Sequence, residues 1–321
     1  MTRDLARAAA LILVLVAAAG SAIAQSYPNR PVKIVVAFAA GTGSDIAARL
    51  IAAQLTQAMG QPFVIENRPG AGGTIGFEQG AKAPPDGYTL LVAPPSLAVS
   101  KWVYPNLKYD PSTDFAAIAM LSQSPLVLAA SPDFPPKTLR ELIDFARANP
   151  GKVNYGASGT APHLAGEKLK MDTGIDMQHV PYKGAPAVLA DLMGGQIPLA
   201  IDNIFVLLPH FKSGKIRPLA VSSAKRHPML PDVPSFVEGG VHGFEIGIWY
   251  GFFAPAGTPR DIVSRLNAEI LKALSVPEVR QKLIDVGSEI LASSPEDSQR
   301  MLQAEIDRWE PVVKKANVSV Q

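Results

Sequence analysis

The chain has 321 residues, no cysteine and a formal net charge of +2. The absence of cysteine excludes disulfides, thiolate metal sites and cysteine nucleophiles, and the near-balance of charge argues against a nucleic acid or an anionic membrane surface as partner. The length allows one large domain or two ordinary ones.

The first residues have the pattern of an export signal. Arg3 and Arg7 form a positive start, and residues 8–19 are an apolar run too short to span a bilayer. Residues 22–24 read Ala-Ile-Ala, a small-x-small cleavage pattern. We therefore expect a signal peptide over residues 1–24, cleavage after Ala24, and a soluble periplasmic protein; a retained membrane anchor is the less favoured alternative.

A strand, a loop of small residues and a helix follow. Residues 32–36 (VKIVV) are typical of a buried parallel strand, and helical spacing then continues until Gly60. Ser44 or Asp45 is the expected helix cap. The backbone N–H groups of residues 41–45 lie at the positive end of the helix dipole and could bind a carboxylate, unless the loop is a plain capped turn.

The next segments continue this alternation. Residues 63–66 and 88–93 read as strands with a helix between them, which indicates a parallel sheet covered by helices on both faces. The glycine-rich loop 67–76 does not match a dinucleotide fingerprint, because Ile75 stands where the third glycine is required.

The middle of the chain reads as a second lobe of strand–helix units. The expected strands are 126–130, 153–155, 178–182, 198–202 and 216–221. Thr138 with Glu141 predicts a capping box before a helix that ends at Ala148.

The last part contains one more strand and a helical tail. Residues 225–243 read as a loop, 246–254 as a strand, and 259–274, 277–286 and 295–316 as helices. Because the tail has no sheet of its own, we expect it to pack on the first lobe. The chain would then cross between lobes near Ser124 and Gly247, which predicts a hinge and a cleft.

Residues 152–169 repeat the layout of the first anion-binding candidate. Ser158, Gly159 and Thr160 follow a strand and precede a helix. The segment resembles a nucleophile elbow, but Thr160 stands where the second glycine belongs and no base accompanies Ser158. We interpret Ser158 as a hydrogen-bond donor.

Four further residues could contribute to the site. His163 and Glu167 are one helical turn apart and could bind a metal. Capping and surface pairing are favoured instead, because none of the five histidines has the spacing of a metal ligand with a third partner. Tyr182 and Asp202 end strands of the second lobe and should face the cleft. Asp202 could bind a ligand amine or hydroxyl, or cap the next helix.

Long ordered blocks run through the mature chain, among them YPNRPVKIVVAFAAGTGSD, IENRPGAGGTIG, HVPYKGAPAVLADLMGGQI and WYGFFAPAGTP. In these blocks the chain resembles the Bug-type extracytoplasmic receptors of tripartite tricarboxylate transporters. The family's first loop usually has a proline where this chain has Ala40 and a glycine where it has Thr42. Thr42 would narrow the pocket or add a hydroxyl donor.

The resemblance implies an α/β, type II periplasmic-binding-protein fold: two parallel-sheet lobes with a double-crossover hinge and a ligand cleft between them. Lobe 1 would comprise 25–124 and 247–321, and lobe 2 would comprise 125–246. It also implies capture of a small carboxylate (a dicarboxylate, an aromatic acid or an amino-acid-like compound) and its delivery to the permease subunits of a membrane transporter.

The resemblance and the loops together indicate a binding site without catalytic residues, cofactor or metal, in a protein expected to be a monomer. The expected ligand-binding residues are Phe38, Gly41, Thr42, Gly43, Ser44, Asp45, Ser158, Gly159, Thr160, His163, Tyr182 and Asp202. Two alternatives remain open: a receptor that signals to a membrane sensor, and a secreted serine hydrolase using Ser158.

Overall fold

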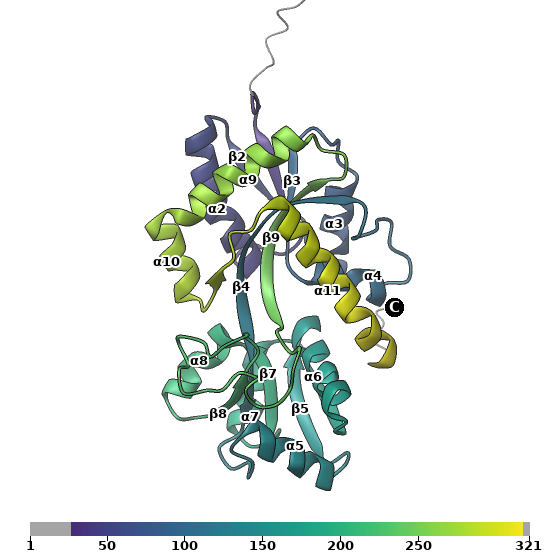
Figure 1. The fold of residues 1–321 in the computed structure, drawn as a ribbon, viewed down its shortest axis with the longest axis vertical. Helices are drawn as coiled ribbons and strands as arrows, with labels where there is room; N and C mark the ends of the chain where they lie inside the picture. Colours follow the sequence, from purple (N-terminus) through teal and green to yellow (C-terminus); the bar gives the residue numbers. More distant parts are fainter. Residues whose placement is uncertain (1–26, 317–321) are drawn as a thin grey trace, which may run out of the picture.

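The computed structural model describes residues 27–316, which form two halves stacked along the long axis of the molecule (Figure 1). The signal peptide expected over residues 1–24 lies outside the described residues. Each half contains a β-sheet with helices packed on it, and one long strand, β4 (Phe115–Ala130), belongs to both sheets. The expected α/β class and two-part architecture are confirmed.

The upper half has the strand order β2-β1-β3-β9-β4. The strands β1 (Val32–Val36), β2 (Phe63–Asn67) and β3 (Thr89–Ala93) are parallel, whereas β9 (Gly247–Pro255) runs antiparallel to β3 and β4. The remaining elements of this half are α2 (Gly43–Met59), a 3-10 turn (Ala71–Gly73), α3 (Thr74–Ala81), α4 (Ser96–Val103), α9 (Arg260–Ser275), α10 (Pro277–Asp285) and β10 (Glu289–Ile290).

The lower half is built around the second part of β4. This part pairs antiparallel with β7 (Leu199–Asn203) and β8 (Arg217–Val221), and β5 (Val153–Ser158) lies parallel to β7 and β6 (Met177–Tyr182). Its helices are α5 (Leu139–Ala148), α6 (Thr160–Thr173), α7 (Ala185–Met193) and α8 (Ile204–Lys212).

The two chain crossings lie side by side as β4 and β9. Their register pairs Ser124 with Ile248 and Pro125 with Gly247. The hydroxyl of Ser222 joins both segments, since it accepts from the N–H of Leu126 and donates to the carbonyl of Ile246. A paired crossover of this kind is a suitable hinge for rotation of one half against the other.

The last helix, α11 (Pro295–Ala316), reaches both halves. Leu302 and Ile306 belong to an upper-half core cluster, whereas Trp309, Val312 and Val313 belong to a cluster made mostly of lower-half residues. The prediction that the tail packs on the first lobe was therefore incomplete, because the apolar stripe of α11 continues past the waist.

Other expectations need correction. The sheets are mixed rather than parallel, because β4, β8, β9 and β10 run antiparallel to their partners. Residues 115–125 were not predicted as strand, and α4 was not predicted as helix. The capping residue of α2 is Thr42 rather than Ser44 or Asp45.

Thr138 caps α5 as predicted, since Glu141 N–H donates to Thr138 Oγ1 at 3.1 Å. The capping box is only half formed, because the Glu141 carboxylate accepts the N–H of Lys137 rather than that of Thr138.

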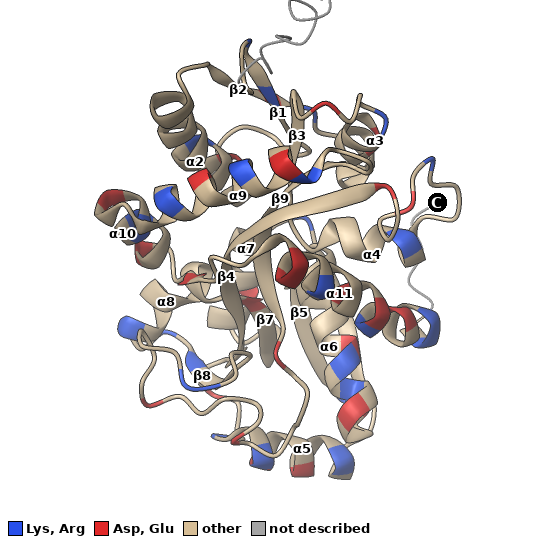
Figure 2. Cartoon of the chain, turned by 45° about the horizontal axis from the view of Figure 1, so that its top comes forward, with Lys and Arg blue, Asp and Glu red and all other residues tan. Residues whose placement is uncertain are grey.

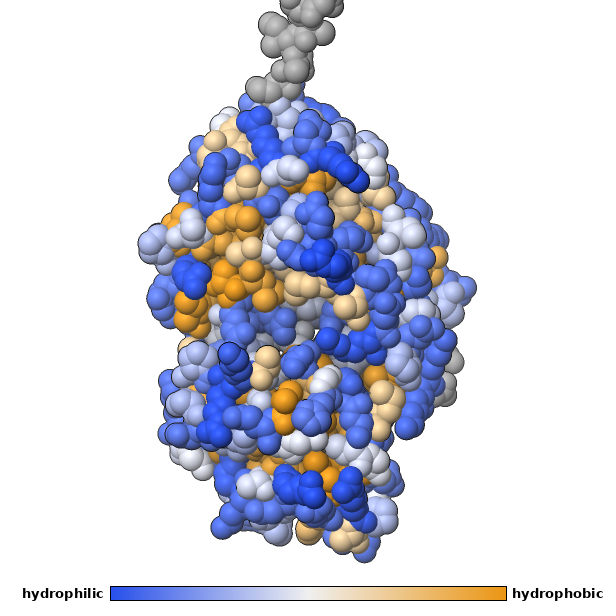
Figure 3. Space-filling view, in the orientation of Figure 1, coloured by the Kyte–Doolittle hydropathy of each residue, from blue (hydrophilic) through white to orange (hydrophobic). Residues whose placement is uncertain are grey.

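Charged side chains lie mainly on the outer surface of both halves, and apolar side chains fill their interiors. Figure 2 shows Lys, Arg, Asp and Glu interleaved on the outer helices, whereas the strands carry few of them. Figure 3 shows the surface narrowed at the waist between the halves. Within residues 27–316, no helix combines the length and apolarity that a bilayer crossing requires.

Candidate functional site

A cavity of about 380 Å³ lies between the two halves, beside the crossing strands. This volume is in the range of small-molecule sites. The upper half contributes Phe38, Gly72, Pro94, Pro95, Ser96 and Val99; the lower half contributes Ser158, Gly159, Thr160, Ala161, Pro162 and Asp202; Ile246, Gly247, Ile248 and Trp309 complete the wall. The structure thus brings together five of the twelve predicted residues: Phe38, Ser158, Gly159, Thr160 and Asp202.

The lower wall contains the start of α6, where backbone donors are unpaired. β5 ends at Ser158, and Gly159 adopts a φ of +81° that directs the chain into the helix. Helical bonding begins when the N–H of His163 donates to the carbonyl of Gly159. The N–H groups of Thr160 and Ala161 consequently have no backbone acceptor within the described chain, which makes this wall suitable for an anionic oxygen.

Asp202, at the end of β7, is the one ionisable side chain that the described residues place on the cavity wall. Its Oδ1 accepts the N–H of Asn203 at 2.7 Å, and the Ser158 hydroxyl donates to its Oδ2 at a long 3.5 Å. The residue is 6% exposed. Burial raises the pKa of Asp202 to about 6, because these two hydrogen bonds only partly offset the loss of water around the charged carboxylate.

The upper wall comes mostly from residues that sequence reasoning missed. Pro94 and Pro95 follow β3, and Ser96 begins α4. The Ser96 hydroxyl is buried and has no hydrogen-bond partner among the described residues. Because an unpaired buried hydroxyl is costly, a polar atom of a bound molecule or water is its expected partner. The signal that could have found it is the position of Pro-Pro-Ser directly after an apolar strand.

Trp309 of α11 provides an aromatic wall. It is 1% exposed, and its indole N–H donates to Glu305 Oε2 at 3.2 Å. The indole of Trp249, on β9, donates to the same oxygen at 3.3 Å, and Arg308 pairs with the other oxygen. No local pattern distinguishes Trp309 in the sequence, because its place at the cavity results from tertiary packing of α11.

The loop after β1 contributes Phe38 to the cavity wall, whereas residues 41–45 do not line it. Asp45 accepts hydrogen bonds from Gly41 N–H, Arg49 Nε and Asn67 Nδ2, each at 2.9 Å. The bond from Arg49 contributes most to holding the pKa of Asp45 at about 2. Asp45 is therefore ionised, and its carboxylate stabilises the loop between β1 and α2.

The helix start after this loop still has unpaired donors. Helical bonding in α2 begins when Ile46 N–H donates to the carbonyl of Thr42, so the N–H groups of residues 43–45 have no backbone acceptor among the described residues. The Thr42 hydroxyl donates to the carbonyl of Ala39 at 2.8 Å, which stabilises the loop.

His163 and Tyr182 lie away from the cavity. The His163 ring stacks on His179, with 3.8 Å between centroids, and its Nε2 is 4.0 Å from Glu167. The Tyr182 hydroxyl donates to Asp191 at 2.6 Å. Both side chains instead pack within the lower half. Within residues 27–316, no three His, Cys, Asp or Glu side chains are placed to hold a metal ion.

Comparison with known proteins establishes the family. The sequence profile described as "Tripartite tricarboxylate transporter family receptor" matches residues 47–318. The chain belongs to this receptor family. The resemblance seen in the sequence blocks is thereby confirmed, and the protein is a solute-binding receptor rather than an enzyme.

Similar receptors cover nearly the whole chain. BugT of Bordetella pertussis is 34% identical over 325 residues, which span 99% of this chain and 100% of BugT. The structure of R. palustris Rpa4515 with adipate is 40% identical, covers 92% of this chain and 100% of that one, and has a TM-score of 0.76. MatC from Rhodopseudomonas palustris with bound malate is 36% identical, with 89% and 100% covered and a TM-score of 0.73.

The hydrolase alternative is not supported by this receptor's geometry. Ser158 lies beside Asp202, and no histidine of the described residues lines the cavity. His163, the nearest histidine along the chain, stacks on His179 instead. Ser158 is therefore a hydrogen-bonding group of a binding cavity.

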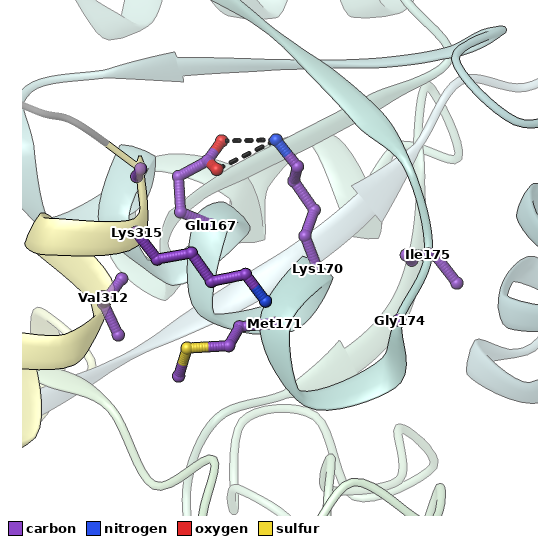
Figure 4. Close-up of a pocket in the computed structure, with 8 residues that line it drawn as sticks. Glu167, Lys170, Met171, Gly174, Ile175, Val312 and Lys315 are labelled. Carbon is purple, nitrogen blue, oxygen red and sulfur yellow. Dashed lines mark hydrogen bonds and ion pairs between the residues drawn. The ribbon is translucent and has the colours of Figure 1, made fainter.

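A second cavity of about 250 Å³ lies between α6 and the last turn of α11 (Figure 4). Glu167 and Lys170 pair there at 2.9 Å, and Tyr155 also donates to Glu167, at 2.8 Å. The side chain of Lys315 extends over Met171 (Figure 4). The Glu167 carboxylate in this cavity is thus compensated by a lysine and a tyrosine of the fold itself.

Proposed function

We propose that this receptor captures a small carboxylate in the 380 Å³ cavity and delivers it to the permease subunits of a tripartite tricarboxylate transporter. The main observation behind this proposal is the cavity wall at the start of α6, where the N–H groups of Thr160 and Ala161 have no backbone acceptor among residues 27–316. Two similar receptors hold adipate and malate, and both are carboxylates.

In this proposal, backbone N–H groups and hydroxyls hold the ligand. Ser158, Gly159 and Thr160 contact the carboxylate, Asp202 lies beside it, Phe38 contacts the rest of the ligand, and bridging water completes the hydrogen bonds. The unpaired N–H groups at residues 43–45 approach from the other half on closure. His163 and Tyr182 do not contact the ligand in this proposal. They stabilise α6 and β6 by packing within the lower half.

We also propose where in the cell this receptor works. The signal peptide 1–24 is removed after Ala24, and the mature protein works in the periplasm as a monomer. The lobes 25–124 with 247–321, and 125–246, close about the paired strands β4 and β9. The β4–β9 crossover at Ser124 and Gly247 supports this division.

A thermal-shift and calorimetry screen tests the capture step. Adipate, malate, benzoate and glutamate are compared with neutral sugars and amines. A carboxylate at a hundredfold its dissociation constant should add about 2.7 kcal/mol to the free energy of unfolding. If sugars or amines raise the transition and no carboxylate does, the proposal is wrong.

Proline substitution tests the helix start directly. Thr160→Pro removes one N–H at the first position of α6, where proline fits the helix, and should weaken carboxylate binding more than Thr160→Ala, which keeps the N–H. The matched control is Arg260→Pro at the first position of α9, which should leave binding unchanged. Delivery is tested by carboxylate uptake in cells with and without the receptor.

A further inference from the structure

The charge of the ligand cavity is unusual for a site that receives anions. Asp202 is the one ionisable side chain on its wall, and no lysine, arginine or histidine of the described residues lines it. A carboxylate that enters therefore meets the buried carboxylate of Asp202. Two like charges at short range in a poorly screened site oppose each other strongly.

A comparison with Asp45 shows what Asp202 lacks. Both residues are almost completely buried. Asp45 is compensated by the Arg49 guanidinium, the Asn67 amide and the Gly41 N–H. Among the described residues, Asp202 has one short hydrogen bond, from the neighbouring Asn203 N–H, and no cationic partner.

Charged groups on the surrounding elements are engaged elsewhere. On α6, His163 stacks on His179 of β6, and Glu167 pairs with Lys170. On α7, Asp191 accepts a hydrogen bond from Tyr182. On β8, Arg217 donates to the backbone carbonyls of residues 131, 134 and 136, and on α8 His210 and Lys212 lie in the last turn of the helix. On β4, the register partner of Asp202 is the apolar Val127. In the upper half, Arg49 is paired with Asp45.

We propose that capture of a carboxylate by this receptor takes up one proton, which resides on Asp202 in the complex. The proton comes from solvent, the Asp202 carboxylate becomes a neutral carboxyl group, and its O–H donates to the bound ligand. Neutral Asp202 changes from a repelling charge into a hydrogen-bond donor. The raised pKa of Asp202, about 6, means that little free energy is needed to add this proton near neutral pH. The inference rests on the proposed function, since it concerns the same cavity.

Isothermal titration calorimetry with adipate, malate, benzoate and glutamate between pH 6 and pH 8 tests the proposal. These carboxyl groups are ionised above pH 7, so a pH dependence there comes from the protein. We expect affinity to rise about tenfold for each pH unit lowered from 8 to 7, and titrations in two buffers of different ionisation enthalpy to show uptake of about one proton. Binding without pH dependence or proton uptake would overturn the proposal.

The substitution Asp202→Asn provides the second arm. It should bind the same carboxylate at pH 8 at least as tightly as the unmodified receptor does, with no pH dependence, whereas Asp133→Asn, at an exposed position, should retain the original dependence. If glutamate alone binds, and Asp202→Asn abolishes that binding, Asp202 pairs with a ligand ammonium group and the proposal is wrong. If no carboxylate binds at any pH, both the proton uptake and the proposed function are wrong. Carboxylate binding without proton uptake would instead contradict the proton uptake alone.

Discussion

The carboxylate of Glu305 accepts the indole N–H of Trp309 at 3.2 Å, one helical turn away on α11. Because the same oxygen also accepts from Trp249 on β9, one buried acid joins the last helix, a crossing strand and the aromatic wall of the cavity. The ligand site therefore depends on a residue that does not line it.

Loss of the Glu305 carboxylate should destabilise the protein. Glu305→Ala leaves two buried indole N–H groups without an acceptor, so we expect a loss of about 2–4 kcal/mol in the free energy of unfolding, measured by urea denaturation. Glu310→Ala on the same helix removes only an exposed ion pair with Lys314 and should cost less than about 1 kcal/mol. Equal effects of the two substitutions would contradict the role assigned to Glu305.

Trp309 should influence carboxylate affinity as well as stability. Trp309→Ala removes a buried indole, with an expected cost of about 3–5 kcal/mol, and widens the cavity. Trp309→Phe keeps an aromatic wall and should retain more of the binding. Calorimetry at a temperature where all variants are folded separates the two effects; unchanged affinity in Trp309→Ala would show that the indole has no part in binding.

Gly43 should tolerate no side chain while Tyr250 is present. A Cβ on Gly43 would come within 2.0 Å of the hydroxyl oxygen of Tyr250, a residue of β9 whose side chain reaches the start of α2. We expect Gly43→Ala to cost about 1–3 kcal/mol of stability and to weaken ligand binding. In Tyr250→Ala the same substitution should be nearly neutral, so additive effects in this double-mutant cycle would contradict the clash.

The His163–His179 stack should make the protein sensitive to acid. Burial and the neighbouring His179 lower the pKa of His163 to about 4, from about 6.5 in the unfolded chain. The unfolded state then binds more protons between these values, so stability is intact above pH 6.5 and falls by up to about 3 kcal/mol as the pH approaches 4. His163→Gln should lose less stability over this range, whereas the exposed His242→Gln should behave as the unmodified protein does.

Asp202 should show the opposite pH dependence. Its folded-state pKa of about 6 exceeds the unfolded value of 3.8, so the folded state holds the extra proton between these values and stability falls as pH rises through this range. The cost at pH 8 is about 3 kcal/mol. Without ligand, Asp202→Asn should be more stable than the unmodified receptor at pH 8 and equal to it below pH 4, by thermal unfolding.

Local patterns were sufficient for many elements of the fold. The apolar run at residues 32–36, the turn at Gly60 and the helix cap at Thr138 each involve neighbours in the sequence, and each was predicted correctly. The largest failure involves contacts of longer range. The first part of β4 becomes a strand because β9 pairs with it, which no periodicity within residues 115–125 could indicate.

The sequence by itself determined the family, the alternating elements and the small-residue loop at Ser158–Thr160, because these depend on residue order and on backbone geometry that few residue types adopt. Only the tertiary structure decided which candidates meet. It placed Trp309 and Ser96 on the cavity wall, moved His163 and Tyr182 away from it, and gave Asp202 a site without a cation while Asp45 received Arg49. The physical reason is that burial and charge compensation depend on segments far apart in the chain, and packing alone brings these segments together.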